Sequence, residues 1–392
     1  MRSFDRFPMV SVVVSGFIGC AADHRSSAQE VVADTAVSET EGGVAWSISD
    51  TPALHIGRDD GVAFGWISAA TVLTDGTVVA ADNLEKVLHI FGSDGTHIRR
   101  VGGRGEGPGE FEATSQLILG GGDTLIVSDQ LSHRVSFFDS SGEYIRLVRP
   151  KTEHSSDLAV LGAIAGDLLI QALYARGRKE GLSRDTMIIA LMDRRTGAVT
   201  PLSRVPGGEY VATITADRLR MRRAPFARST LAAATSDRYA IGYADTDSIV
   251  VFDSNHALLH QIPRGERSIA RVRKPDVRRY YDATRPPGSD VVDYLRRAGN
   301  PDVAPASMPA FDKLIFDRSG NLWVRRYRPP WHPGAEIWDV YDMNGRAIGD
   351  VPVLMNHGEI VEIGDNHIVA VLTDSMDVET LAVYGLVRRN VQ

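Results

Sequence analysis

Short runs of apolar residues recur along this chain, each bounded by residues that favour tight turns. In residues 71–95, for example, the apolar runs around Val79 and Ile90 lie beside the turn pairs Asp75-Gly76 and Asp94-Gly95. Alternating Val, Ile and Leu positions punctuated by Asp-Gly or Ser-Gly pairs predict short β-strands joined by hairpin turns. We therefore expect an all-β protein.

This strand pattern repeats along the chain. Residues 71–95 align without a gap with residues 118–142, and a period of roughly 40–50 residues with three or four short strands is typical of a propeller blade. Six units are expected, near residues 66–100, 111–149, 158–203, 229–262, 308–350 and 358–388. The first two units match at Asp82 and Asp129, Leu84 and Leu131, Phe91 and Phe138, and Gly95 and Gly142.

The last unit supplies only three strands, while the segment from Ala45 to Gly57 has no partner at the other end of the chain. Pairing this segment into the last blade would close the ring and remove two exposed sheet edges. The predicted fold is a six-bladed β-propeller over residues 44–392, closed by its N-terminal strand and carrying one helical insertion at 263–308.

A glycine-rich stretch, Val101 to Phe111, joins the first two units. Together with the recurring Asp, Phe and Gly positions it resembles the NHL-type six-bladed propellers, in particular those of bacterial envelope lipoproteins of unassigned function. The resemblance covers about residues 45–390 and implies the fold but little about activity. Gly103 to Gly109 lacks the Lys-Ser/Thr pair of a phosphate-binding loop and precedes a strand, so we expect an interblade turn.

An Asp ends the second strand of several units. The recurring positions are Asp82, Asp129, Asp245 and Asp374. Such carboxylates could ring a metal in the central channel, or each could accept backbone N–H bonds and cap a turn. Two units lack the Asp, so we expect turn caps.

Composition and the N-terminus indicate where the protein works. The 392 residues are 43% hydrophobic and 24% charged, and the formal net charge of −7 gives no reason to expect a nucleic-acid partner. Residues 1–20 have the charged start and apolar stretch of a secretory signal. This stretch ends at Cys20, the only cysteine, in Phe17-Ile18-Gly19-Cys20, which resembles a bacterial lipobox.

The lipobox resemblance implies that Cys20 is lipidated and that residues 21–43 form a flexible tether. It places the protein in the cell envelope, on the periplasmic side of the outer membrane or at the cell surface. The alternatives are a signal cleaved at Ala21 or Ala22, or a buried terminal strand with a free cysteine. We expect a monomer that meets the membrane only through its lipid.

All the long insertions are expected on one face of the disc. In a blade, the turns after the first and third strands share one face, and the second-to-third loops and blade connections share the other. In this chain, the turns after the first and third strands are uniformly tight. The second-to-third loops and blade connections include residues 176–185, 204–228, 263–309 and 327–336. We therefore expect the working face there, with a helix over 290–298 that begins after Ser289.

These loops are rich in arginine. Guanidinium groups at a channel mouth suit carboxylates, phosphates or acidic glycans; alternatively they pair with nearby acids or lie in solvent. The candidate ligand-binding residues are Arg222, Arg223, Arg278, Arg325, Arg326, Trp331 and His332.

The catalytic signals are weak. The eleven histidines form no spaced cluster, and no Ser/His/Asp order stands out. The sequence therefore favours a non-catalytic propeller without a cofactor, which binds an anionic small molecule, a glycan or an envelope protein through its arginine-rich face. The alternative is a metal-dependent propeller hydrolase or lyase with Ca or Zn held at the same channel mouth.

Overall fold

The computed structural model describes residues 44–57, 61–152, 158–175, 179–215, 218–262, 264, 269–285, 303–353 and 358–390. Within them, six antiparallel sheets follow one another along the chain. Blade 1 contains β3 (Ile67–Val72), β4 (Val78–Asp82), β5 (Val87–Phe91) and β6 (His97–Gly102). Blade 2 contains β7 (Gln116–Gly120), β8 (Thr124–Asp129), β9 (Arg134–Phe138) and β10 (Tyr144–Val148). Blade 3 contains β11 (Leu158–Ile164), β12 (Asp167–Ala175), β13 (Gly181–Met192), β14 (Val199–Thr215) and β15 (Arg218–Arg223).

The second half of the chain continues the pattern. Blade 4 contains β16 (Thr230–Ala234), β17 (Arg238–Tyr243), β18 (Ser248–Asp253) and β19 (Leu258–Ile262). The helix α1 (Lys274–Thr284) follows. Blade 5 contains β20 (Phe311–Phe316), β21 (Leu322–Arg326), β22 (Glu336–Tyr341) and β23 (Ala347–Val353). Blade 6 contains β24 (Gly358–Ile363), β25 (His367–Thr373) and β26 (Glu379–Asn390). The predicted six-bladed propeller is confirmed.

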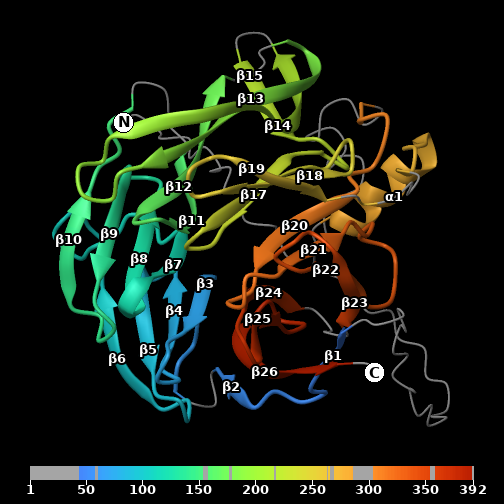
Figure 1. The fold of residues 1–392 in the computed structure, drawn as a ribbon. Helices are drawn as coiled ribbons and strands as arrows, with labels where there is room; N and C mark the ends of the chain where they lie inside the picture. The colour runs from blue at the N-terminus through green and yellow to red at the C-terminus, as the bar shows by residue number, and fades with distance from the viewer. Residues whose placement is uncertain are drawn as a thin grey trace.

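The first strands of the blades surround the centre of the disc. β3, β7, β11, β16, β20 and β24 each contact the first strand of the next blade, and β24 contacts β3 in turn. Figure 1 shows the sheets arranged around this centre, with the first blade in blue beside the last in red.

The N-terminal segment completes the last blade. β1 (Val44–Ile48) and β2 (Leu54–Ile56) both pair antiparallel with β26, β1 along its C-terminal half and β2 along its start. Ile56 is fully buried and packs with residues of blades 6 and 1, among them Phe91 and Leu381. The first segment of the fold is thus held by the last strand.

The core lies between neighbouring blades. Leu88 and Phe111 pack with Phe138 between blades 1 and 2, and Trp323 and Trp338 belong to a cluster that spans blades 5 and 6. Because neighbours cover both faces of a blade, β4 and β5 are buried at every position rather than at every second one.

Three features of the loop regions differ from the sequence prediction. The segment 176–185, expected as a loop, belongs to β13 from Gly181 onward. The segment 204–228, expected as a loop, contains the extension of β14 and the whole of β15, which form an extra hairpin on blade 3. Pairing with the long β13 continues β14 through Gly207 and Gly208. The expected helix at 290–298 lies outside the described residues, whereas α1 occurs earlier, at Lys274–Thr284.

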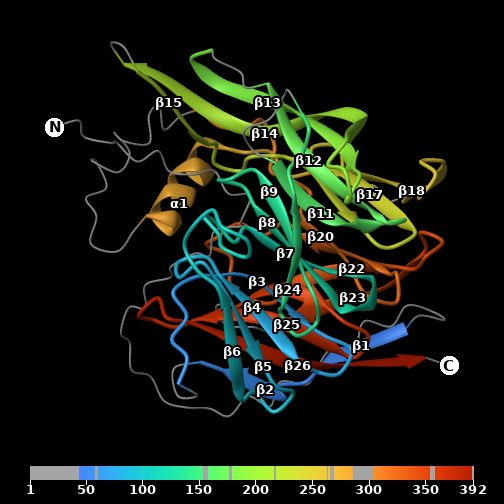
Figure 2. The ribbon, with the colours of Figure 1, turned by 90° about the vertical axis from the view of Figure 1, so that its left-hand side faces the viewer.

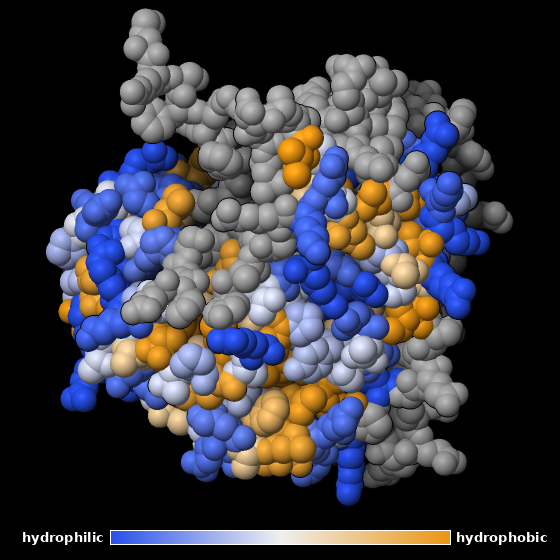
Figure 3. All heavy atoms as spheres, turned by 90° about the horizontal axis from the view of Figure 1, so that it is seen from above, coloured by the Kyte–Doolittle hydropathy of each residue, from blue (hydrophilic) through white to orange (hydrophobic). Residues whose placement is uncertain are grey.

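The surface is mixed in character. Figure 3 shows hydrophilic and hydrophobic residues interspersed over the face seen from above. No helix among the described residues is long and apolar enough to cross a membrane.

Candidate functional site

A cavity of about 520 Å³ lies beside α1, where the chain passes from blade 4 to blade 5. Second-to-third loops and the blade connection form its walls, so it opens on the face where the sequence predicts the working site. Figure 2 shows α1 and β15 on this same side of the molecule. The cavity is lined by Asp247, Ile269, Ala270, Arg273, Asp276, Arg279, Met308, Pro309, Ala310, Arg326, Tyr327, Pro329, Trp331 and His332.

The start of α1 is fixed by a charged cap. Pro275 lies in the first turn, where a missing N–H costs nothing. The Asp276 carboxylate accepts the backbone N–H of Arg273 at 2.9 Å and pairs with the Arg273 side chain at 3.0 Å. The hydrogen bond from Arg273 is the main reason why the pKa of Asp276 lies below its ordinary value. This acid is therefore ionised and already partnered where it lines the cavity.

The apolar face of α1 holds the helix against the disc. Val277 and Tyr281, one turn apart, are buried in a cluster with Phe226 and Met308, and Trp331 packs against this cluster. The Trp331 and Phe226 rings meet edge to face with their centroids 5.9 Å apart. The cavity wall is thus aromatic and fixed by packing.

Asp247 and Arg326 of the lining belong to a chain of ion pairs. The buried Arg264 guanidinium pairs with Asp247 and, at 3.2 Å, with Asp339. Arg326 pairs with Asp339 at 2.7 Å and with Asp350 at 3.2 Å. Asp247, like Asp276, is therefore neutralised by an arginine.

Arg279 is the exception among the charged residues of the cavity. It lies on the exposed side of α1 and makes no ion pair within the part of the chain that the structure describes. Since the two acids of the lining are paired, Arg279 gives the cavity a positive charge that a ligand can use.

The structure brings together three of the seven predicted ligand-binding residues. Arg326, Trp331 and His332 all line the cavity. The other four, Arg222, Arg223, Arg278 and Arg325, lie outside its lining.

Those four residues have different surroundings. Arg222 on β15 hydrogen bonds to the Tyr281 hydroxyl and stacks over the Tyr281 ring, 5.0 Å from its centroid. This contact ties the extra hairpin to α1. Arg223 and Arg278 are exposed, on β15 and α1 respectively.

Arg325 is buried in an ion-pair cluster between blades 5 and 6. Its guanidinium pairs with Asp312 at 2.7 Å, Glu359 at 2.8 Å and Glu336 at 3.4 Å. Burial lowers the pKa of Arg325, but the three carboxylates outweigh it and raise the pKa above its ordinary value. These contacts hold the guanidinium in the ion-pair cluster, and Arg325 does not line the cavity.

The carboxylates of this cluster are in unequal positions. Burial raises the pKa of Glu336, whose Oε2 is buried without a hydrogen-bond partner among the described residues. Glu359 is also buried, but Lys313 and Arg325 compensate and hold its pKa below the ordinary value. Glu336 is therefore harder to ionise than Glu359.

Sequence reasoning missed Arg273, Arg279 and Asp247 as cavity residues. A signal for α1 was present in Lys274-Pro275-Asp276, a helix start, followed by Val277 and Tyr281 on one face. The charged residues between them hide this weak apolar stripe. Asp247 carries no sequence signal, because the other residues of the lining, such as Arg279 and Arg326, are distant from it in sequence.

Three of the four recurrent aspartates cap turns. Asp82 accepts backbone N–H bonds from Gly65, Trp66, Leu84 and Glu85, and Asp129 accepts them from Glu112, Ala113 and Ser132. Asp374 also accepts two, from Met376 and Val378. Asp245 differs, because its main partner is the Arg184 guanidinium at 2.6 Å.

The glycine-rich connection forms the expected interblade turn. Gly102 and Gly109 adopt φ of 93° and 78°, which favour glycine. The buried Arg134 donates to the carbonyls of Gly105, Glu106 and Glu110. The loop thus presents carbonyl oxygens to a guanidinium and does not form an anion cradle.

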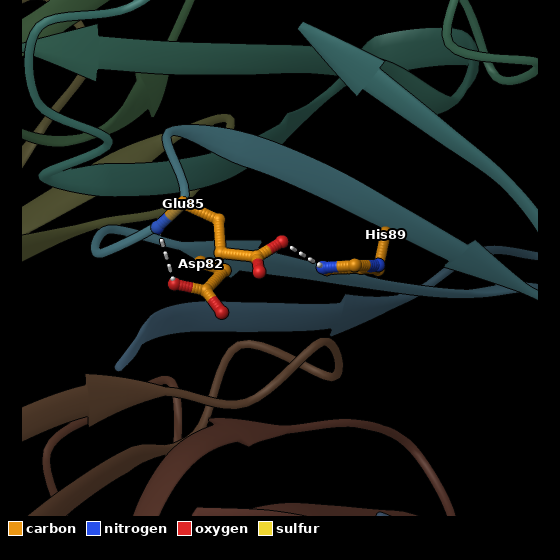
Figure 4. A group of neighbouring side chains, drawn as sticks. All are labelled: Asp82, Glu85 and His89. Atoms are coloured by element: carbon orange, nitrogen blue, oxygen red, sulfur yellow. Dashed lines mark hydrogen bonds and ion pairs between the residues drawn. The ribbon is translucent and has the colours of Figure 1, made fainter. Parts of the chain in front are cut away.

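One group among the described residues has metal-ligand chemistry. Asp82, Glu85 and His89 place a carboxylate oxygen or an imidazole nitrogen each within 4.8 Å of the others. Figure 4 shows the three side chains converging around the β4–β5 turn of blade 1. Burial, and then the neighbouring His97, lower the pKa of His89 to about 4. This group lies in blade 1, apart from the cavity lining.

Comparison with known proteins agrees with the fold. A family described as a six-bladed beta-propeller matches residues 59–149. No curated protein matches. The resemblance to NHL-type propellers stays a prediction.

Solved structures of similar shape include two from Bacteroides. A putative exported protein from Bacteroides fragilis is 12% identical, with a TM-score of 0.46 over 88% of this chain and 96% of that one. A member of the DUF4221 family from Bacteroides vulgatus is 11% identical, with a TM-score of 0.47 over 90% and 100%. Virginiamycin B lyase from Staphylococcus aureus is 9% identical, with a TM-score of 0.40 over 87% and 99%.

Proposed function

We propose that this propeller is a non-catalytic binding protein that takes a small anionic molecule with a flat or apolar body into the cavity beside α1. The observation that carries the proposal is the cavity itself, which joins Arg279, a side chain with no ion pair among the described residues, to an aromatic wall at Trp331. An acidic sugar such as a uronate has both the carboxylate and the flat face that these two groups recognise.

The remaining charges of the cavity favour binding over proton transfer. Asp247 and Asp276 are each engaged by an arginine, so neither is placed to accept a proton from a ligand. Arg326 is tied to Asp339 and Asp350, which fixes its guanidinium at the cavity edge. Arg279 is left to meet the ligand's charge.

Titration of the purified protein with glucuronate, inorganic phosphate and short dicarboxylates tests the proposal. Calorimetry should show saturable binding of an acidic ligand, and filling the cavity should change the emission of Trp331. Arg279→Ala should weaken binding at least about tenfold, because a hydrogen bond to a charged group contributes roughly 1.5–3 kcal/mol.

Arg278→Ala is the matched control, because Arg278 is the exposed neighbour on α1 and does not line the cavity. Its affinity should equal that of the unchanged protein. Equal losses in both variants, or no loss in Arg279→Ala, would show that the ligand binds elsewhere.

We further propose that the protein works in the bacterial cell envelope, held by a lipid on Cys20. The secretory layout of residues 1–20 and the lipobox-like sequence support this location. Several acyl chains, at about 0.8 kcal/mol per buried methylene, would make the attachment effectively permanent.

The anchor can be tested by replacing the acceptor thiol. Cys20→Ser should move the protein from the membrane fraction to the soluble fraction of cells that express it, while the propeller keeps its circular dichroism spectrum. If the serine variant stays with the membrane and resists extraction by high salt, the lipid attachment proposed for Cys20 is wrong.

A further inference from the structure

Beside the β4–β5 turn of blade 1, the carboxylates of Asp82 and Glu85 lie near a buried imidazole nitrogen of His89. The His89 side chain is only 6% exposed, and its Nε2 is buried without a hydrogen-bond partner among the described residues. Nε2 faces the Glu85 carboxylate at 3.9 Å, which is too long for a hydrogen bond. Figure 4 shows the imidazole directed at Glu85, with Asp82 below it.

The other ring nitrogen of His89 is already engaged. Nδ1 lies 3.3 Å from Nε2 of His97. If Nδ1 donates its proton to His97, the lone pair of Nε2 faces two carboxylates. A metal-binding histidine is held in this way, with its second nitrogen donating to a neighbour.

Blade 2 contains the same turn without this cluster. In the alignment of the first two repeats, Asp129 corresponds to Asp82. Ser132 and Ser136 correspond to Glu85 and His89. Asp129 still caps its turn with backbone N–H bonds. Capping therefore requires neither a glutamate nor a histidine at these positions.

The two blades also differ in how the capping carboxylate is neutralised. In blade 2 the buried Arg134 lies 3.5 Å from Asp129. In blade 1 the corresponding residue is Val87, and no Lys or Arg forms an ion pair with Asp82 within the described residues. The nearby Lys86 donates to the Asn83 side chain. Blade 1 thus keeps the buried acid without an ion pair to it among the described residues.

We propose that Asp82, Glu85 and His89 bind a divalent transition-metal ion, which replaces in blade 1 the positive charge that Arg134 supplies in blade 2. Asp82 Oδ2 accepts a single hydrogen bond, from Gly65, and keeps a lone pair for the metal. Glu85 is exposed, and the oxygen that faces His89, Oε2, also pairs with the exposed Arg100 at 3.0 Å. The ion would take the place of this exposed arginine contact.

The ligand set selects the metal. Two carboxylate oxygens and one imidazole nitrogen suit Zn²⁺, Co²⁺ or Mn²⁺, whereas Mg²⁺ and Ca²⁺ prefer oxygen ligands alone. Water would complete the coordination from the side that Glu85 leaves open. The site is distinct from the cavity and does not depend on the function proposed for it.

Equilibrium dialysis and calorimetry of the purified, untagged protein with Zn²⁺ and Co²⁺ test the site. We expect one ion per chain, a rise in melting temperature on adding Zn²⁺, and visible absorption by bound Co²⁺. His89→Gln should weaken Zn²⁺ binding by about 100-fold, and His97→Gln by roughly tenfold through loss of the positioning contact. In the presence of a chelator, both variants should have the same melting temperature as the unchanged protein.

Two further variants keep the test decisive. Glu85→Gln lies on the surface of the turn, so it removes a ligand without disturbing the core if His89→Gln does not fold. His332→Gln, an exposed histidine at the cavity, should bind Zn²⁺ as tightly as the unchanged protein. The absence of saturable binding, or binding that survives both His89→Gln and Glu85→Gln, would overturn the proposal.

Discussion

The charged residues of this propeller differ mainly in which oppositely charged side chains they pair with. Arg325 and Arg326 are neighbours on β21, and each is bound by more than one carboxylate. The sequence identified both as candidate ligand contacts, but only Arg326 reaches the cavity. Strand alternation sends adjacent side chains to opposite faces of a blade, which separates their surroundings.

Glu336 offers a test of this charge balance. Because burial raises its pKa, the folded protein binds this proton more tightly than the unfolded chain does. The contribution of Glu336 to stability is therefore most favourable at low pH and declines as pH rises through the raised pKa. Glu336→Gln should consequently lose less stability than the unchanged protein as the pH rises above the ordinary pKa of glutamate, about 4.5.

Urea denaturation at a series of pH values measures this difference. Glu180→Gln, which alters an exposed carboxylate, should follow the unchanged protein. Parallel curves for Glu336→Gln and the unchanged protein would mean that Glu336 titrates normally.

Among the elements, the strands were more predictable than the segments that form the site. The blade strands carry dense Val, Ile and Leu patterns between Asp-Gly turns, so local sequence and tertiary packing agree. β15 was missed because its sequence, Arg-Leu-Arg-Met-Arg-Arg, is mostly charged. It forms a strand because β14 presents an edge for it to pair with.

The helix α1 was also difficult to predict from the sequence. α1 has few apolar residues, and its position depends on partners distant in sequence, such as Phe226 and Trp331. A pattern along the chain cannot reveal that such residues meet. Of the cavity, the sequence therefore predicted the face and three lining residues, but not the helix that completes it.

At the scale of the whole molecule, the last blade depends on a short segment from the beginning of the fold. Ile56 on β2 is fully buried between blades 6 and 1. Ile56→Ala should reduce the free energy of unfolding by about 2–5 kcal/mol, as expected for truncating a buried aliphatic side chain. The shift in urea midpoint measures this loss.

His55→Ala is the neighbouring control, since His55 is exposed on the same strand. It should change the free energy of unfolding by less than about 0.5 kcal/mol. If the two variants were equally stable, β2 would contribute nothing to holding the ring together.

The pairing of β1 with β26 also determines the order in which the parts of the protein can fold. Val44 faces Asn390 in this ladder, so almost the entire described chain separates the two partners. A nascent or translocating chain can build its early blades one at a time, but β1 must wait unpaired until the final strand emerges. Completion of the fold is therefore a post-synthetic event, and any truncation that removes β26 leaves both ends of the disc without a partner.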